Sequence, residues 1–116
     1  MDTSSKVGQY APIVQLLLTE QQWPPQKSED YQKIAITDKD NNHYQLLATG
    51  WITPNRYVDN LLIHIQIKPD GKVWLLENNT ELRVAEELVA RGVPRTDIVL
   101  GFHPPQYRAL TGYAVK

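Results

Sequence analysis

The chain has 116 residues, enough for one domain with a single hydrophobic core and too few for two well-packed ones. A charged fraction of 22% and a formal net charge of -1 provide no bulk attraction to phosphate, which disfavours autonomous DNA binding. The absence of cysteine excludes disulfides and thiolate chemistry, and no apolar run approaches the roughly 18 residues that span a membrane. The N-terminus also lacks the basic region of a signal peptide, so we expect a cytoplasmic protein. The expected single domain covers residues 1–116.

A first helix is expected to begin near Tyr10, after a polar segment, residues 1–9, that we expect to fray. Apolar residues then recur at helical spacing, and Pro12 is tolerated in a first turn. These apolar residues are Ile13, Val14, Leu16, Leu17 and Leu18. Trp23-Pro24-Pro25 ends the helix, because a residue before proline is forced out of the α region, and residues 26–29 form a loop.

Two antiparallel strands are predicted next. Residues 31–37 alternate, with Ile34 and Ile36 on one face, and the polar residues 38–42 form a turn. Tyr44, Leu46 and Ala48 then resume the alternation. Residues 50–56 connect this second strand to a third.

The third strand, residues 61–68, has the alternation of a half-buried strand. Leu61, Ile63, Ile65 and Ile67 form the aliphatic set that should face the core, and His64, Gln66 and Lys68 form the other set. Pro69 stands where a turn favours a fixed φ, and Gly71 where it favours a positive φ. Residues 72–76 should therefore return as a fourth antiparallel strand.

A second helix follows, with Asn79 or Thr80 as its N-cap and Glu81 in its first turn. Its apolar stripe consists of Leu82, Ala85, Leu88 and Val89. Gly92 suits the left-handed position that ends a helix, and Val93 is expected to contact Leu88.

Residues 98–102 form a short fifth strand, which makes the sheet mixed if it pairs in parallel. The predicted fold class is therefore α+β: an N-terminal helix, a four-stranded antiparallel meander, a capped helix and a short fifth strand.

No arrangement of residues identifies a catalytic site. The three histidines, His43, His64 and His103, share no metal-ligand spacing, and phosphate-binding and hydrolase motifs are absent. A histidine on a strand or in a turn more often serves as a hydrogen-bonding group than as a catalyst. We expect no catalytic residue, no metal and no cofactor, which favours a binding role.

Motifs distributed over residues 10–115 carry a resemblance to a known family. They are His43-Tyr44-Gln45-Leu46, Gly50-Trp51, Arg56-Tyr57, Leu62-Ile63-His64-Ile65, Asp70-Gly71-Lys72-Val73-Trp74, Gly92-Val93-Pro94 and Asp97-Ile98-Val99-Leu100-Gly101-Phe102-His103. The chain resembles XisI, the fdxN element excision controlling factor family of cyanobacteria. It departs from the family pattern at Ile52 and Gln66, where Asp is common, and this argues against a shared acidic site.

The resemblance implies a non-enzymatic accessory factor for site-specific excision of a DNA element during heterocyst differentiation. The implied partner is an XisH-like protein, which resembles nucleases, within a recombinase complex on DNA. Two alternatives stay open: a small metal-dependent nuclease or other hydrolase that uses His64 and His103, and a direct DNA-binding directionality factor. The sequence pI near 6.3 disfavours the second alternative.

Four residues are predicted to bind the partner: His103, Arg108, Arg56 and His64. Residues 101–108 are the predicted docking loop, because two prolines limit its conformations and Arg108 can make a forked contact with a carboxylate. An apolar patch at Leu62, Trp74 and Tyr57 further predicts a homodimer.

Overall fold

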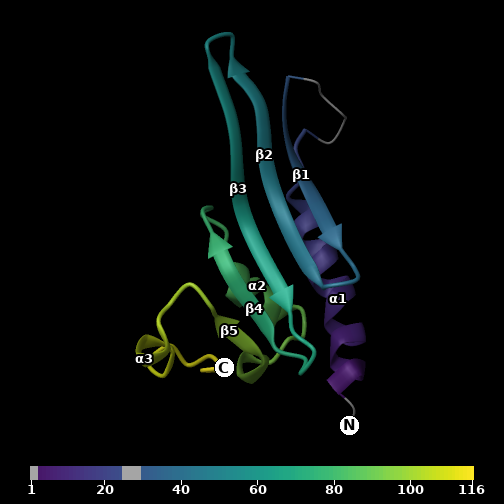
Figure 1. Ribbon diagram of the computed structural model, residues 1–116, viewed down its shortest axis with the longest axis vertical. Helices are drawn as coiled ribbons and strands as arrows, with labels where there is room; N and C mark the ends of the chain where they lie inside the picture. The colour runs from purple at the N-terminus through teal and green to yellow at the C-terminus, as the bar shows by residue number, and fades with distance from the viewer. Residues whose placement is uncertain (1–2, 25–29) are drawn as a thin grey trace.

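The computed structural model describes residues 3–24 and 30–116, and a five-stranded sheet dominates it (Figure 1). In chain order the elements are α1 (Thr3–Glu20), β1 (Tyr31–Asp38), β2 (His43–Thr53), β3 (Arg56–Ile67), β4 (Val73–Asn78), α2 (Val84–Ala90), η1 (Arg95–Asp97), β5 (Ile98–Leu100) and α3 (Pro105–Arg108). The predicted loop at residues 26–29 lies outside the described residues.

The strand order is β1-β2-β3-β4-β5. The first four strands form an antiparallel meander, and β5 pairs in parallel with β4, so that Ile98 lies opposite Val73. The sheet is therefore mixed, and the predicted α+β class is confirmed.

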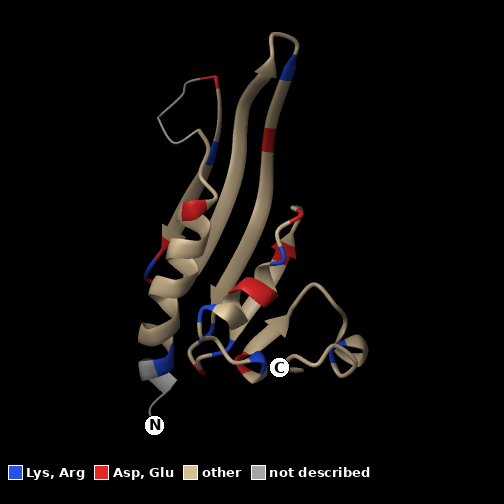
Figure 2. Cartoon of the chain, turned by 180° about the vertical axis from the view of Figure 1, so that it is seen from behind, with Lys and Arg blue, Asp and Glu red and all other residues tan. Residues whose placement is uncertain are grey.

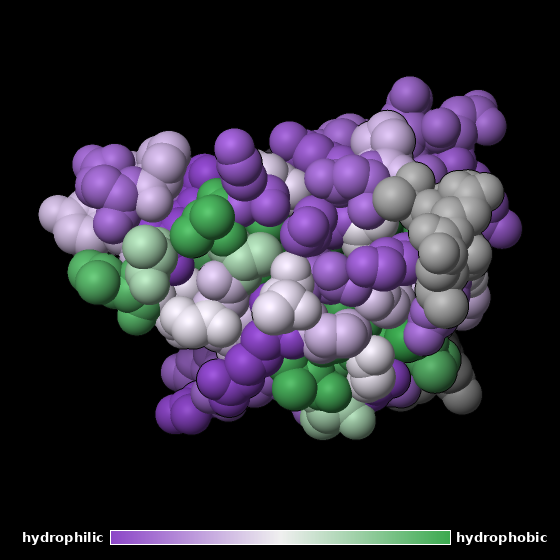
Figure 3. Space-filling model, turned by 90° about the horizontal axis from the view of Figure 1, so that it is seen from below, coloured by the Kyte–Doolittle hydropathy of each residue, from purple (hydrophilic) through white to green (hydrophobic). Residues whose placement is uncertain are grey.

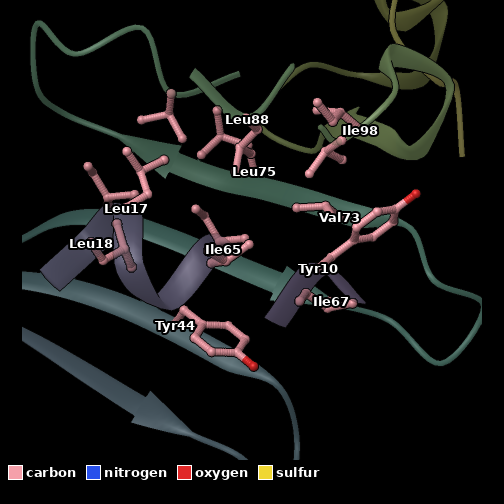
Figure 4. Packing of buried hydrophobic residues seen from close by; sticks show 14 of the residues in the cluster. Tyr10, Leu17, Leu18, Tyr44, Ile65, Ile67, Val73, Leu75, Leu88 and Ile98 are labelled. Atoms are coloured by element: carbon pink, nitrogen blue, oxygen red, sulfur yellow. The ribbon is translucent and has the colours of Figure 1, made fainter. Parts of the chain in front are cut away.

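One face of the sheet carries the hydrophobic core, against which α1 and α2 both pack (Figure 4). The fully buried side chains come from both helices and from strands β2 to β5. The largest of them are Tyr44, Leu17, Leu18, Leu46, Ile63, Ile65, Ile67, Leu88 and Ile98. Because each strand in this set contributes alternate residues, the opposite face of the sheet is built from the intervening side chains.

The expected helix start near Tyr10 is wrong, because α1 already begins at Thr3. Pro12 consequently lies inside the helix and not in its first turn. Proline removes one intrahelical hydrogen bond, but buried Tyr10 and Val14 on either side hold the helix against the sheet. The buried stripe also differs from the expected one, since Leu16 is 56% exposed.

A buried carboxylate fastens the beginning of α1 to η1. The hydroxyl of Tyr10 donates a hydrogen bond to Asp97 Oδ2 at 2.5 Å, and Lys6 Nζ lies 3.4 Å from the same oxygen. Burial and the adjacent Asp97 raise the pKa of Tyr10 to about 12. This contact explains why the helix extends well ahead of its apolar stripe.

Strand β1 turns Ala35, and not its two isoleucines, toward the core. Ala35 pairs with Leu46 and packs against the core, so Ile34 and Ile36 lie on the opposite face. Hydrophobicity alone would favour Ile34 and Ile36 for the core face. The register overrides that preference, since buried Leu46 fixes which β1 residues share its face.

A β-bulge in β3 changes the face that Leu61 occupies. Leu46 pairs with Ile63 and Leu47 with Leu61, which leaves Leu62 as the extra residue. Leu62 packs against the core, whereas Leu61 lies on the open side beside Leu47. The expected core positions of Ile63, Ile65 and Ile67 are confirmed, and that of Leu61 is wrong.

Strands β2 and β3 are longer than predicted and project past the other strands as a hairpin arm (Figure 1). Residues 50–56, expected to be a connection, form its end, where Trp51 pairs with Tyr57. The two exposed rings lie 5.3 Å apart between centroids. Cross-strand aromatic contacts of this kind stabilise a hairpin outside the core.

The tight turn between β3 and β4 is confirmed. The N–H of Gly71 donates to the carbonyl of Lys68 at 2.8 Å, and Gly71 has a φ of 90°. Glycine alone adopts that φ without strain.

The second helix begins later than predicted, at Val84. The predicted caps, Asn79 and Thr80, both lie ahead of the helix. The side-chain amide of Asn79 donates to Glu77 Oε1 at 2.7 Å, and Thr80 Oγ1 accepts from the N–H of Leu82 at 3.2 Å. The predicted C-terminus is confirmed, because the N–H of Val93 bonds the carbonyl of Leu88 at 3.0 Å and Gly92 has a φ of 108°.

Candidate partner-binding segment

The C-terminal segment, residues 101–116, lies against β4 and β5. The N–H of Gly101 donates to the carbonyl of Leu75, and the N–H of Ala114 donates to that of Ile98, both at 2.8 Å. Between these anchors the chain loops outward through α3 (Figure 1). The loop is therefore attached at both ends to the rigid sheet, an arrangement that suits recognition.

Arg108 holds the loop closed. Its Nε donates to the carbonyl of His103 at 3.0 Å, and its Nη1 donates to that of Val115 at 3.3 Å. The guanidinium also lies 5.0 Å from the ring centroid of Trp74, where Lys68 Nζ approaches to 3.8 Å. Because its donors face the chain's own carbonyls, Arg108 is placed to fix the shape of the loop.

The outer surface of the loop is apolar and aromatic. Phe102 and Tyr107 are about half exposed, and Leu110 is 81% exposed. Seen from below, one of several hydrophobic patches lies at the end of the molecule that carries α3 (Figure 3). Aromatic side chains on a fixed loop are common anchors of protein interfaces.

The structure separates the four predicted site residues. His103 and Arg108 lie together in the loop, where the ring of His103 also contacts Phe102, with 4.5 Å between centroids. Arg56 begins β3 at the end of the hairpin arm, remote from the loop (Figure 1). His64 lies on the sheet face opposite the helices and forms a hydrogen bond with His43.

Burial lowers the pKa of His64 below its usual range, and nearby His43 adds to this, whereas Glu77 opposes it.

The apolar patch expected to mediate dimerisation is not continuous. Leu62 packs against the core and Trp74 is half-buried under the C-terminal segment, so Tyr57 alone stays exposed.

Sequence reasoning missed Asp97, the buried acid that joins Tyr10 and Lys6. Asp97 is hard to identify from the sequence, because a single Asp ahead of a short strand usually forms part of a turn.

Within the described ranges, His, Asp and Glu side chains form no group of three suited to a metal ion. The described helices also include none that is long and apolar enough to cross a membrane.

Comparisons with known proteins agree with this architecture. The family model described as XisI protein matches residues 1–115, whereas no curated protein matches the chain. A crystal structure of a XisI-like protein from Anabaena variabilis is 41% identical, with a TM-score of 0.82 over 93% of this chain and 97% of that one. The fdxN element excision controlling factor XisI from the same organism is 30% identical, with a TM-score of 0.73 over 96% and 99%.

Proposed function

We propose, given that the chain belongs to the XisI family, that it is an accessory factor controlling excision of a DNA element of the fdxN type. The similar protein from Anabaena variabilis is itself a controlling factor, which favours a regulatory role over a catalytic one. Heterocyst differentiation in a cyanobacterium is the proposed setting, and the cytoplasm is the proposed compartment.

The proposed mode of action is binding of an XisH-like protein through the docking loop, residues 101–108, and the adjoining Leu110. The single observation that carries this proposal is the exposure of Phe102, Tyr107 and Leu110 on a loop tied to the sheet. Arg108 restricts the loop before binding, so less conformational entropy is lost when the partner docks. His103 and Arg108 thus act as positioning residues, and the exposed apolar side chains make the contacts.

Arg56 and His64 lie on other surfaces, and we assign them to a second contact of the assembly. We also propose that the protein is a homodimer, because exposed Ile36, Trp51 and Tyr57 leave apolar surface that a second copy can cover. Light scattering at micromolar concentration is the direct check of that proposal.

Excision in the native host tests the function. Deleting the gene should lower the amount of excised junction, measured by quantitative PCR during differentiation. The wild-type gene and a Leu16→Ser control, whose exposed leucine lies on α1, should restore it, whereas Phe102→Ser with Tyr107→Ser should not. Unchanged excision after deletion would refute the proposal. DNA cleavage by the purified chain, lost in His64→Ala or His103→Ala, would replace it with the hydrolase alternative.

A further inference from the structure

The face of the sheet opposite the helices has a distinctive composition over β1 to β3. We call it the open face and define it by the outward-facing residues of these strands. They are Gln32, Ile34, Ile36, Asp38, His43, Gln45, Leu47, Thr49, Trp51, Tyr57, Asp59, Leu61, His64 and Gln66. Asp38, at the end of β1, and Asp59 are the Asp, Glu, Lys or Arg residues in this set.

An apolar row crosses the middle of the open face. Ile34 of β1 pairs with Leu47 of β2, and Leu47 pairs with Leu61 of β3. The bulge at Leu62 creates this row, because without it Leu61 would share the core face of Ile63. Ile36, one row away, is 41% exposed.

The described elements leave this part of the sheet uncovered. Both α1 and α2 pack on the other face, and the C-terminal segment meets the sheet at β4 and β5, where Ala114 bridges Val99 and the Arg108 guanidinium lies over Trp74. The boundary between covered and uncovered sheet therefore falls between β3 and β4.

Charge argues for a protein occupant and against nucleic acid. Between His43 and Ile67 the only Asp, Glu, Lys or Arg residues are Arg56 and Asp59, which leaves the arm almost free of charge (Figure 2). Lys33 of β1 pairs with Ala48 and so belongs to the helix face. A nucleic-acid surface needs rows of cations, whereas the centres of protein interfaces are depleted of charge.

The same composition fits a second copy of this chain. The middle of the face carries no charge, so two copies can meet there without like-charge repulsion, and a twofold interface needs a patch that complements itself. Three strands of this length span about 35 Å by 14 Å, a footprint of roughly 500 Å² before side-chain relief. A standard interface buries about 800 Å² of accessible surface per partner. Because protruding side chains make the accessible area of a face larger than its flat footprint, the open face is in the range of a stable dimer.

We infer that a second copy packs on the open face, sheet against sheet, with the Ile34, Leu47 and Leu61 row at its centre. This inference rests on the proposed homodimer and assigns its interface. Packed sheets of this kind lie about 10 Å apart with their side chains interdigitated. The Trp51 and Tyr57 pair extends the contact onto the partner along the arm.

Sedimentation equilibrium of the wild type and two variants tests the inference. The wild type should show twice the chain mass of 13.3 kDa at micromolar concentration. Ile36→Lys with Leu47→Lys should raise the dimer dissociation constant at least tenfold. The matched control Leu16→Lys, which changes an exposed leucine on α1, should leave it unchanged.

Cross-linking keeps the test independent of folding defects. Because the chain has no cysteine, Gln45→Cys and Leu16→Cys each introduce a single thiol. A short bismaleimide should link copies of the Gln45→Cys protein and not those of Leu16→Cys.

A monomeric wild type overturns the inference together with the homodimer. A dimer that resists the open-face substitutions and is linked only through Leu16→Cys overturns the interface alone. A monomer whose open-face variant loses affinity for the XisH-like protein would assign the face to that partner and overturn the inference. The first two outcomes leave the docking loop untouched, since that loop is tested by its own variants.

Discussion

His43 and His64 face each other across β2 and β3, with His43 Nδ1 2.9 Å from His64 Nε2. One ring nitrogen donates and the other accepts, so the contact requires an unprotonated nitrogen on one of the rings. Asp38 of β1 pairs with His43, and Glu77 of β4 pairs with His64, which completes a polar row across four strands.

Acid should destabilise the protein through this pair. Burial and His43 lower the pKa of His64 below its ordinary value of 6.5, so the unfolded chain binds the proton more readily. The stabilisation is complete above pH 6.5 and is lost as the pH falls through the folded pKa, at no more than about 1.4 kcal/mol per pH unit for one proton. Urea unfolding at pH 7.5 and 5.5, at one protein concentration, measures it. His64→Gln should show a shallower pH dependence, and identical dependence in both proteins would contradict the account.

Tyr10→Phe should lower the free energy of unfolding by about 1–3 kcal/mol, because Asp97 stays buried with one hydrogen-bond donor fewer. Tyr44→Phe is the control, since its hydroxyl donates to the neutral Asn42 Oδ1 at 3.1 Å and not to a carboxylate, so its loss should matter less. Urea denaturation of the three proteins provides the comparison. Equal losses of unfolding free energy in the two variants would show that the hydrogen bond to the buried carboxylate stabilises the protein no more than an ordinary one.

Two glycine substitutions should act in opposite directions. Gly92→Ala should destabilise the protein by roughly 1–2 kcal/mol, because alanine is strained at a φ of 108° even though its Cβ would meet no atom within 4 Å. Gly8→Ala, also free of contacts but inside α1, should stabilise it by about 0.5–1 kcal/mol. Thermal unfolding measures both, and a shift of the same sign in the two variants would be inconsistent with the backbone argument.

Arg108→Gln should loosen the C-terminal segment locally. Without the guanidinium, the carbonyls of His103 and Val115 lose their donor, so the bond from Ala114 to Ile98 should open more often. Hydrogen exchange at the Ala114 amide is expected to accelerate. Arg95→Gln, which removes an exposed cation 5.6 Å from the Tyr113 ring, is the control and should change exchange less. An unaltered exchange rate at the Ala114 amide in Arg108→Gln would show that Arg108 does not hold the loop closed.

Local signals in the sequence predicted the fold well where chain neighbours determine the structure. Gly71 and Gly92 each mark a positive φ, and the turn and helix end that they form were predicted from those residues. Long-range packing decided the rest. The bulge at Leu62 depends on how β2 pairs with β3, so alternation alone assigned Leu61 to the wrong face.

The candidate site shows the same division. Residues 101–108 were predicted as the docking loop from prolines and the family resemblance. The contacts of Arg108 come from its own carbonyl neighbours, which a linear pattern does not reveal. Exposure of Phe102 and Tyr107 likewise depends on where the segment returns to β5 at Ala114.

Calorimetric titration of the purified chain with a purified XisH-like protein tests the central claim most directly. The account predicts saturable binding that weakens at least tenfold, about 1.4 kcal/mol, in Phe102→Ser with Tyr107→Ser and stays unchanged in Leu16→Ser. Melting temperatures of the three proteins should agree within a few degrees, about the effect of 1 kcal/mol in stability. An affinity that is undetectable in the wild type, or equal in all three proteins, would contradict it.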